Sequence, residues 1–166
     1  KGDVEDIVKA GGMTWTLLRP GYFLTNLLPP VVYWMYPEFK DRKFFNSYEA
    51  DSVLKLVDPD DIGAFATAAF EDPKKFGGHI VNVVGENMRV DDMLNELEKA
   101  SGQSITAIYQ TEGETDSAKG ERFVAGHIVC IGLDRYVDLE KVKSWGVPPT
   151  SFKQFLEKHR YEIRAQ

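Results

Sequence analysis

The sequence predicts an α/β protein in which strands alternate with helices and pair in parallel. Three apolar runs rich in β-branched residues have the composition of strands, and they cover residues 13–18, 53–57 and 79–84. Stretches with apolar residues at helical spacing alternate with them, at residues 2–10, 59–70 and 90–101. Because parallel strands need a crossover connection, which is usually a helix, this order favours a layered sheet covered by helices.

Composition narrows the class of protein. The 166 residues are 43% hydrophobic and 28% charged, which describes an ordinary globular chain with one core. The net charge of −6, with basic residues interleaved among acids, argues against a nucleic-acid surface. No apolar run approaches the roughly 20 residues that span a bilayer, so we expect no membrane segment. The single cysteine, Cys130, cannot form an internal disulfide, which fits a reducing, cytoplasmic compartment.

The first elements are delimited by glycine and proline. Gly11-Gly12 ends the first helix, and Pro20-Gly21 stops the strand that follows. We expect a short helix from Tyr22 to Leu28, which Pro29-Pro30 breaks or restarts. Seven of the sixteen residues from Tyr33 to Tyr48 are aromatic, and this segment is too irregular for a clean helix or strand.

The helix at 59–70 has a clear start. Asp58 can cap it, Pro59 fits the first helical position, and the acids Asp60 and Asp61 favour the positive end of the helix dipole. A metal cluster is the alternative for these acids, but the proline and the apolar residues that follow favour the cap.

The second half is predicted to be mostly helical. We expect an edge strand at 105–109, a loop or frayed helix entry at 111–120 and an apolar buried segment at 123–131. Two helices follow at 139–146 and 151–164, and Thr150 or Ser151 caps the second of them.

The turn after the first strand is the best candidate for a site, because ligands of open α/β sheets bind outside the carboxyl ends of the strands. Pro20-Gly21 lets the backbone approach a flat ligand, Tyr22 and Phe23 supply rings, and Asn26 can donate and accept hydrogen bonds. A strand-to-helix turn with simply buried aromatic side chains is the other interpretation, and both stay open. Arg19 is expected to anchor the strand end through a carboxylate.

Three stretches carry a family resemblance. Lys1 to Glu5, Thr16 to Phe23 with Asn26, and Val57 to Gly63 resemble the NmrA-like proteins, which are atypical short-chain dehydrogenases with a Rossmann domain. The resemblance implies the C-terminal portion of a doubly wound, Rossmann-like parallel sheet in residues 1–110, including the variable aromatic segment 33–48. A small, mostly helical substrate or partner lobe would follow in residues 111–166.

The sequence lacks the motif by which the family's Rossmann domain binds the phosphates of the dinucleotide. The family's G-x-x-G-x-x-G turn, which holds the pyrophosphate, is not in this sequence. A chain that opens on Lys1, already in helical periodicity, therefore looks like the second half of a larger fold. We expect these residues alone to bind dinucleotide very weakly, and two copies to pair through exposed sheet edges.

The resemblance also implies site residues for NADP or NAD. Lys1 matches the lysine that contacts the nicotinamide ribose and assists a catalytic tyrosine, which would precede residue 1; the alternative for Lys1 is a frayed terminal residue. The expected cofactor-binding residues are Lys1, Pro20, Gly21, Tyr22, Phe23, Leu24, Thr25 and Asn26. Most rings of the aromatic segment are expected in the core, with substrate contacts from Tyr22, Tyr33 and Trp34.

By resemblance the intact protein is a redox-sensing regulator or a reductase of small carbonyl or quinone-like substrates. A protein-binding module without chemistry, acting on a regulatory protein, is the competing class. The remaining candidates are weaker: His79, His127 and His159 match no metal spacing, and Cys130, flanked by apolar residues, is expected to be buried and inert. We expect no metal.

Overall fold

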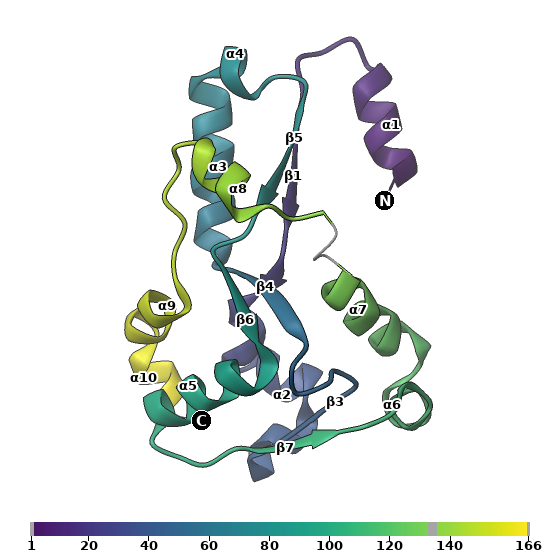
Figure 1. Cartoon of the computed structure of the whole chain (residues 1–166), viewed down its shortest axis with the longest axis vertical. Coiled ribbons are helices and arrows are strands. Elements are labelled where there is room, and N and C mark those ends of the chain that lie inside the picture. The colour runs from purple at the N-terminus through teal and green to yellow at the C-terminus, as the bar shows by residue number, and fades with distance from the viewer. Residues whose placement is uncertain (1, 133–135, 166) are drawn as a thin grey trace.

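The structure is a computed structural model that describes residues 2–132 and 136–165, and it is an elongated α/β molecule (Figure 1). Its strands form three small sheets. β1 (Thr16–Pro20) pairs in parallel with β5 (His79–Val83) at one end of the molecule, and β3 (Lys43–Asn46) pairs in parallel with β7 (Thr106–Tyr109) at the other. Between them, β4 (Val53–Val57) lies parallel to β2 (Tyr22–Phe23) and antiparallel to β6 (Glu86–Arg89). The predicted fold class is confirmed.

Helices surround these sheets. The α-helices are α1 (Gly2–Ala10), α2 (Val31–Met35), α3 (Pro59–Glu71), α4 (Pro73–Phe76), α5 (Val90–Ser101), α6 (Glu112–Lys119), α7 (Glu121–Gly132), α8 (Leu139–Ser144), α9 (Phe152–Lys158) and α10 (Arg160–Arg164). Two 3-10 helices, η1 (Leu24–Leu27) and η2 (Pro37–Asp41), complete the set. None of the helices in the described residues combines the length and apolar character that crossing a bilayer requires.

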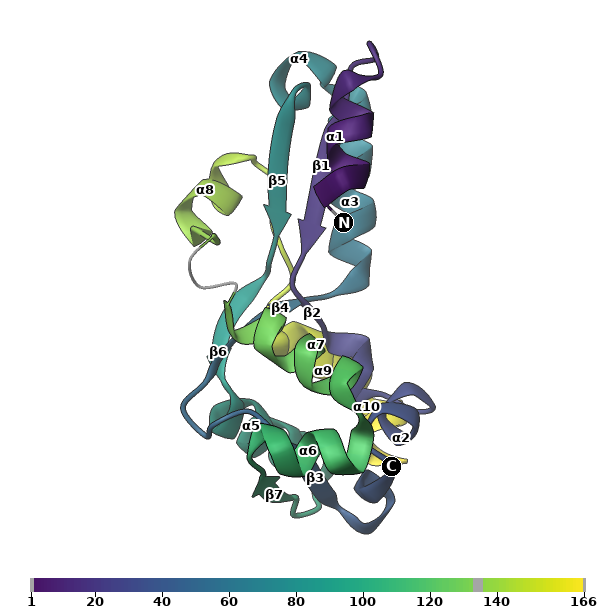
Figure 2. The ribbon, with the colours of Figure 1, turned by 90° about the vertical axis from the view of Figure 1, so that its right-hand side faces the viewer.

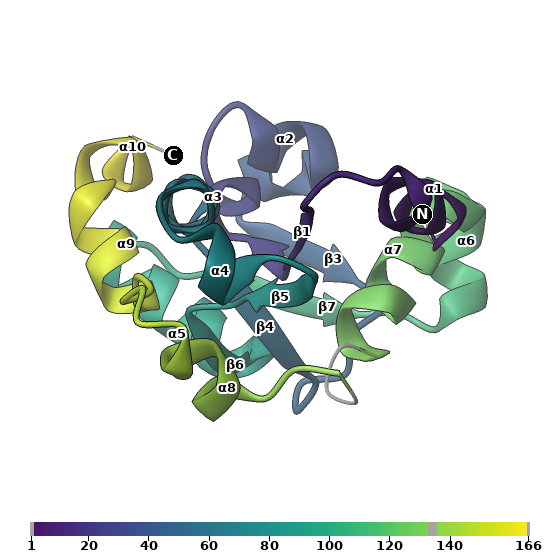
Figure 3. The ribbon, with the colours of Figure 1, turned by 90° about the horizontal axis from the view of Figure 1, so that it is seen from above.

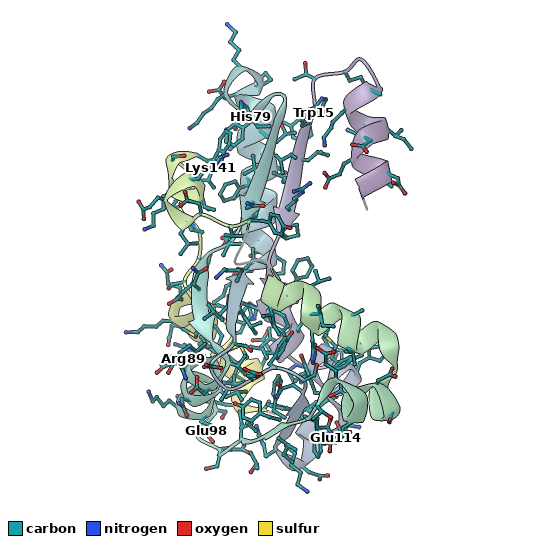
Figure 4. All side chains as sticks on the ribbon, turned by 45° about the vertical axis from the view of Figure 1, so that its right-hand side comes forward. Trp15, His79, Arg89, Glu98, Glu114 and Lys141 are labelled. Atoms are coloured by element: carbon teal, nitrogen blue, oxygen red, sulfur yellow. The ribbon has the colours of Figure 1, made fainter. Side chains whose placement is uncertain are left out.

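The first strand is shifted relative to the prediction. β1 begins at Thr16 and includes Pro20, where the prediction had residues 13–18. Proline is tolerated here because, among the described residues, β1 is paired on one side only, and the N–H of Gly21 continues the ladder by donating to the Val83 carbonyl at 3.1 Å. Figure 4 labels Trp15 and His79, side by side at the start of this strand pair.

Long-range pairing explains the elements that the sequence patterns missed. The irregular aromatic segment contains β3, whose partner β7 lies about sixty residues away along the chain. The predicted short helix at 22–28 is instead β2 followed by η1. β6 has an alternating pattern of burial, but its four residues are too few to show a period in sequence. The segment 111–120, predicted as a loop or frayed helix entry, contains α6 (Glu112–Lys119), which starts with a capping box between Thr111 and Glu114.

The hydrophobic core has two clusters that meet at β4. The larger cluster occupies the half of the molecule with β3, α2, α5 and α9, and includes Leu54 and Leu56 of β4. The smaller one lies under β1, β5 and α3 and includes Val57, the next residue of the same strand. Figure 2 shows β4 at the waist between these two parts.

The acidic residues at 58–61 cap α3, as predicted, and they also bind the segment that contains α9. The Asp58 carboxylate accepts from the N–H of Asp60 at 3.1 Å and, with the Asp60 carboxylate, pairs with Lys158 on α9. Asp61 accepts from Thr150, just before α9. Ser151 supplies the predicted cap of α9. The lobe boundary at residue 110 stays a prediction, and these bonds link its two sides.

The first helix stands apart from the strands in the view from the front (Figure 1), and seen from above it lies over α6 and α7 (Figure 3). No residue of α1 is buried. Glu5 holds it to β1, because the Glu5 carboxylate accepts two hydrogen bonds from the Arg19 guanidinium. The predicted anchoring role of Arg19 is therefore confirmed. This bond lowers the pKa of Glu5 and raises that of Arg19.

Candidate functional site

A cavity of about 570 Å³ opens where the chain leaves β2. Its walls are mainly aromatic, with Tyr22, Trp34, Tyr48, Phe123 and His127. The other lining residues are Asn26, Met35, Pro37, Gly126 and Cys130. We call this space the aromatic cavity. Among the described residues that line it, none carries a charge at neutral pH, so it suits an uncharged, flat ligand.

The cavity is assembled from segments far apart in the sequence. Tyr22 comes from β2 and Asn26 from η1, at the carboxyl end of the β2–β4 pair. Trp34 belongs to α2 and is 83% exposed, so its ring lies at the rim. Helix α7 closes the opposite wall, with Phe123, His127 and Cys130 at positions that fall on one helix face.

The tyrosines in and behind the cavity wall are neutral hydrogen-bonding groups. Burial raises the pKa of Tyr22 well above its ordinary value, and it raises the pKa values of Tyr36 and Tyr48 as well. The hydroxyls of Tyr22 and Tyr36 lie 3.2 Å apart and share a hydrogen bond. A tyrosine that relays protons at neutral pH needs a lowered pKa, so these three bind or pack and do not ionise.

His127 is fixed by a turn after β3. The buried side chain of Asn46 accepts from the N–H of Tyr48 at 2.9 Å and donates to the Phe44 carbonyl at 3.3 Å. This turn presents Ser47 to the imidazole, whose Nδ1 lies 2.7 Å from the Ser47 hydroxyl and 3.3 Å from its backbone N. Burial lowers the pKa of His127 to about 4, so the ring is neutral at pH 7.

The predicted site residues fall in two places. Tyr22, Asn26 and Trp34 meet in the aromatic cavity. Pro20 and Gly21 line a separate hollow of about 70 Å³. A Cβ on Gly21 would lie 2.0 Å from the Lys55 carbonyl oxygen, so glycine is needed there for the approach of strand β4. The expectation that Pro20 and Gly21 also let the backbone approach a flat ligand stays a prediction.

The residues after β2 differ in what they offer. Phe23 is 37% exposed and leaves its ring open to contact, whereas the Leu24 side chain is fully buried in the core. The exposed fraction of the whole Leu24 residue is 0%, so it offers no surface to a ligand here, and its expected cofactor contact stays a prediction. Thr25 is half-buried.

Two predicted site residues remain, Tyr33 and Lys1. Tyr33 does not line the aromatic cavity; its ring packs on the core beneath the Lys40 ammonium, at 5.8 Å. Lys1, the expected catalytic and ribose-binding residue, lies outside the described residues. Its role stays a prediction.

The burial of the α7 side chains differs from the sequence prediction. Residues 123–131 were expected to be buried, yet Ile128 and Val129 are exposed because only one face of the helix packs. Cys130, expected to be buried, is half-buried and faces the cavity. The i, i+4 spacing of Phe123 and His127 is the sequence feature that places both rings on one face of a helix. The partners of His127, Ser47 and Tyr48, lie about 80 residues away in the sequence.

Another sizeable hollow has a different character. A groove of about 610 Å³ lies over β6 and α5, lined by several charged side chains such as Glu86, Arg89 and Lys99. Arg89 is paired with Asp91 and Asp92, and Lys99 with Glu96. No group of three or more potential metal ligands occurs in the part of the chain that the structure describes.

Several solved structures with a similar fold contain a bound dinucleotide. The chain is similar to a nucleoside-diphosphate-sugar epimerase from Staphylococcus aureus, with a TM-score of 0.74 at 14% identity over 94% of this chain and 56% of that one. An NADPH-dependent quinone oxidoreductase from Escherichia coli gives 0.75 at 16% identity over 94% and 58%. NmrA, a negative transcriptional regulator in complex with NADP, gives 0.65 at 16% identity over 99% and 57%.

These likenesses show a shared Rossmann-like fold, and the chain spans a little over half the length of each of these proteins. A search among curated proteins found no match. The model of the NmrA-like family matches residues 1–118, which is more than half of the sequence and includes the strand, the turn and the acidic helix start described above. The chain belongs to the NmrA-like family.

Proposed function

We propose that the intact protein binds NADP(H) or NAD(H) and is either a reductase of small carbonyl or quinone-like substrates or a redox-sensing regulator. The observation that carries this proposal is the aromatic cavity, which begins at Tyr22 and Asn26, in the segment that follows a parallel strand. That segment is where the family resemblance puts the nicotinamide. A cavity beside it with aromatic, uncharged walls suits a flat, uncharged substrate.

The residues after β2 fit the nicotinamide end of a dinucleotide. The open ring of Phe23 and the half-buried Thr25 offer an apolar surface and a hydroxyl, and Leu24, buried in the core, supports the segment between them. Lys1 would contact the ribose. The dinucleotide, when bound, supplies the hydride, and the cavity orients the acceptor and excludes water.

Proton supply is assigned to a residue outside the cavity. Burial raises the pKa of Tyr22 and of Tyr48 above the ordinary value, so at neutral pH both offer hydroxyl groups for hydrogen bonds. In the family pattern the proton donor is a tyrosine four positions before Lys1. Its presence in the intact protein favours the reductase, and another residue there favours the regulator.

Turnover by the intact protein tests the proposal. NADPH oxidation is measured with a panel of quinones and aldehydes, and a reductase is expected to turn over at least one of them. Trp34→Ala is expected to raise KM with little change in kcat, because this exposed ring contacts only the outer part of a ligand. Tight NADPH binding without turnover by any substrate would remove the reductase and leave the regulator.

The isolated 166 residues provide a second test. They are expected to bind NADPH far more weakly than the intact protein, because the glycine turn and helix N-terminus that hold the pyrophosphate are not in this sequence. Calorimetric titration measures this, and micromolar affinity of the isolated chain would contradict the expectation.

A protein-binding role is the second candidate, and the outer face of α7 favours it. Ile128 and Val129 are exposed there, on the helix whose other face lines the cavity. A regulatory protein docked on them would sense the occupant of the cavity through one helix. In the described residues β1 pairs only with β5, so its other edge also suits pairing with a second copy. A cytoplasmic location, with Cys130 reduced, belongs to the same proposal.

A further inference from the structure

The imidazole of His127 is a group in the aromatic cavity whose chemistry the proposed hydride transfer does not use. The residue is only 4% exposed, and its Nε2 has no hydrogen-bond partner among the described residues. Buried polar atoms in proteins are nearly always paired, so an unpaired one in a cavity wall indicates a missing partner.

The contacts of the other ring nitrogen determine where the proton lies. The backbone N–H of Ser47 is directed at Nδ1 at 3.3 Å, and a backbone N–H can only donate. Nδ1 must therefore accept, and it also accepts from the Ser47 hydroxyl at 2.7 Å. A neutral imidazole has one N–H, so the proton is on Nε2, which is consequently a donor without an acceptor.

Aromatic neighbours hold the ring in its plane. Tyr48 stacks on His127 with centroids 4.1 Å apart and an angle of 22°, and Phe123 packs at 4.4 Å and 56°. Two hydrogen bonds to Nδ1 restrict rotation within that plane. The direction of the Nε2–H bond is thus fixed before any ligand arrives, which is the condition for a selective contact.

The character of the cavity limits what the acceptor can be. Its described lining residues are uncharged, so a carboxylate or phosphate would enter without a counter-charge. A carbonyl oxygen on a flat ring needs no counter-charge, and its ring can pack against the aromatic walls. The donor and the walls therefore favour the same class of ligand.

We propose that the Nε2–H group of His127 is the specificity-determining donor of the aromatic cavity and hydrogen-bonds a neutral carbonyl oxygen on a flat, ring-containing ligand. The inference rests on the proposed function in treating this cavity as the substrate site. Water does not reach the Nε2 atom in the ligand-free structure, so a side chain of the cavity wall shifts when the ligand enters. Side-chain rotamers change on a fast timescale, so this requires no movement of a helix.

A matched pair of ligands isolates the hydrogen bond, using the chain without cofactor. The ketone 1-tetralone and its hydrocarbon analogue tetralin have the same fused rings and differ in the carbonyl group. Dissociation constants are measured by NMR titration, following the amide of Gly126 and the indole N–H of Trp34, both in the cavity wall. The ring nitrogen signals of His127 report the tautomer and the hydrogen bond directly.

The variant His127→Phe keeps a flat ring and removes the donor. We expect it to weaken 1-tetralone binding about five- to tenfold while tetralin changes less than twofold, since one hydrogen bond is lost. Phe123→Leu, which removes only apolar contact, is the matched control and is expected to weaken both ligands alike. Equal weakening of both ligands by His127→Phe would make the role of the residue structural and overturn the proposal.

The ring signals keep the test decisive if His127→Phe does not fold. In the unchanged chain Nε2 must carry the proton, and its signal must respond to 1-tetralone but not to tetralin. A proton on Nδ1, the same response to both ligands, or no cavity response to either would each reject the proposal. Because no cofactor is used, ligand selection by His127 can hold even if the intact protein fails to oxidise NADPH, and the two failures are distinct.

Discussion

The Asp61 carboxylate accepts two hydrogen bonds from Thr150, one from its backbone N–H at 2.9 Å and one from its hydroxyl at 2.7 Å. Asp61 is 5% exposed, and its partner lies 89 positions along the chain. The first turn of α3 thereby holds the segment that leads into α9. Gly85 packs against the same residue, since a Cβ there would lie 2.3 Å from the Thr150 carbonyl oxygen.

Removing this carboxylate should destabilise the protein. Asp61→Ala leaves the N–H and hydroxyl of Thr150 without their acceptor, and we expect a loss of about 2–3 kcal/mol in the free energy of unfolding. Asp60→Ala is the control: that carboxylate is 77% exposed and forms an exposed ion pair with Lys158, so its loss should cost less than about 1 kcal/mol. Urea unfolding measures both, and equal losses would contradict the account.

Two glycines should respond to alanine in opposite directions. Gly21→Ala puts a methyl group 2.0 Å from the Lys55 carbonyl oxygen, so strands must separate and we expect a loss of about 3 kcal/mol or more. Gly63 lies within α3 with nothing within 4 Å of a Cβ, so Gly63→Ala should stabilise the protein by about 0.5–1 kcal/mol. Thermal unfolding of the two variants, with the unchanged chain alongside, tests both signs.

His127 should make the protein less stable in mild acid. Its folded pKa of about 4 lies below the ordinary value of 6.5, so the unfolded chain takes up the proton first. This contribution to stability is complete above pH 6.5 and is lost progressively as the pH falls towards 4. Between pH 7 and 5 we expect a loss of about 2 kcal/mol.

The comparison with His127→Phe identifies the source of that loss. The phenylalanine side chain does not titrate, so the free energy of unfolding of the variant should change much less between pH 7 and 5. Urea midpoints at the two pH values provide the measurement. An unchanged pH dependence in the variant would assign the effect to another group.

The first helix should be loosened by losing one carboxylate. Glu5→Gln removes the charge that pairs with Arg19 and Lys9, and since no α1 side chain is buried, little else holds the helix. We expect several-fold faster amide hydrogen exchange across residues 2–10, with β5 unaffected. Asp3→Asn is the control on the same helix, because no ion pair of that residue appears among those the structure gives. Raising the salt concentration should narrow the difference between Glu5→Gln and the unchanged chain.

Local chemistry explains which elements the sequence could predict. The helix at Asp58-Pro59, the strand at 53–57 and the cap at Ser151 all depend on neighbouring residues, and they occur where expected. β3 and β6 owe their existence to partners elsewhere in the chain. The pattern of a four-residue strand is too short to reveal such a partner.

Local sequence likewise predicts one wall of the aromatic cavity and not the other. Tyr22 and Asn26, in the wall next to β2, could be proposed from the sequence, because strand ends in α/β folds are places for ligands. The opposite wall could not: Ser47, Tyr48 and His127 meet only through the packing of α7. The spacing of His127 relative to the other histidines says nothing of a hydroxyl partner 80 positions away.

The shared strand β4 has a practical consequence for protein engineering. Leu56 faces the cluster that supports the cavity, and the adjacent Val57 faces the cluster under β1 and β5. Neither core is complete without this strand, so a chimaera that exchanges cavities between relatives has to carry β4 along and match its residues to both hosts. The unit available for transplantation is therefore larger than the cavity it contains.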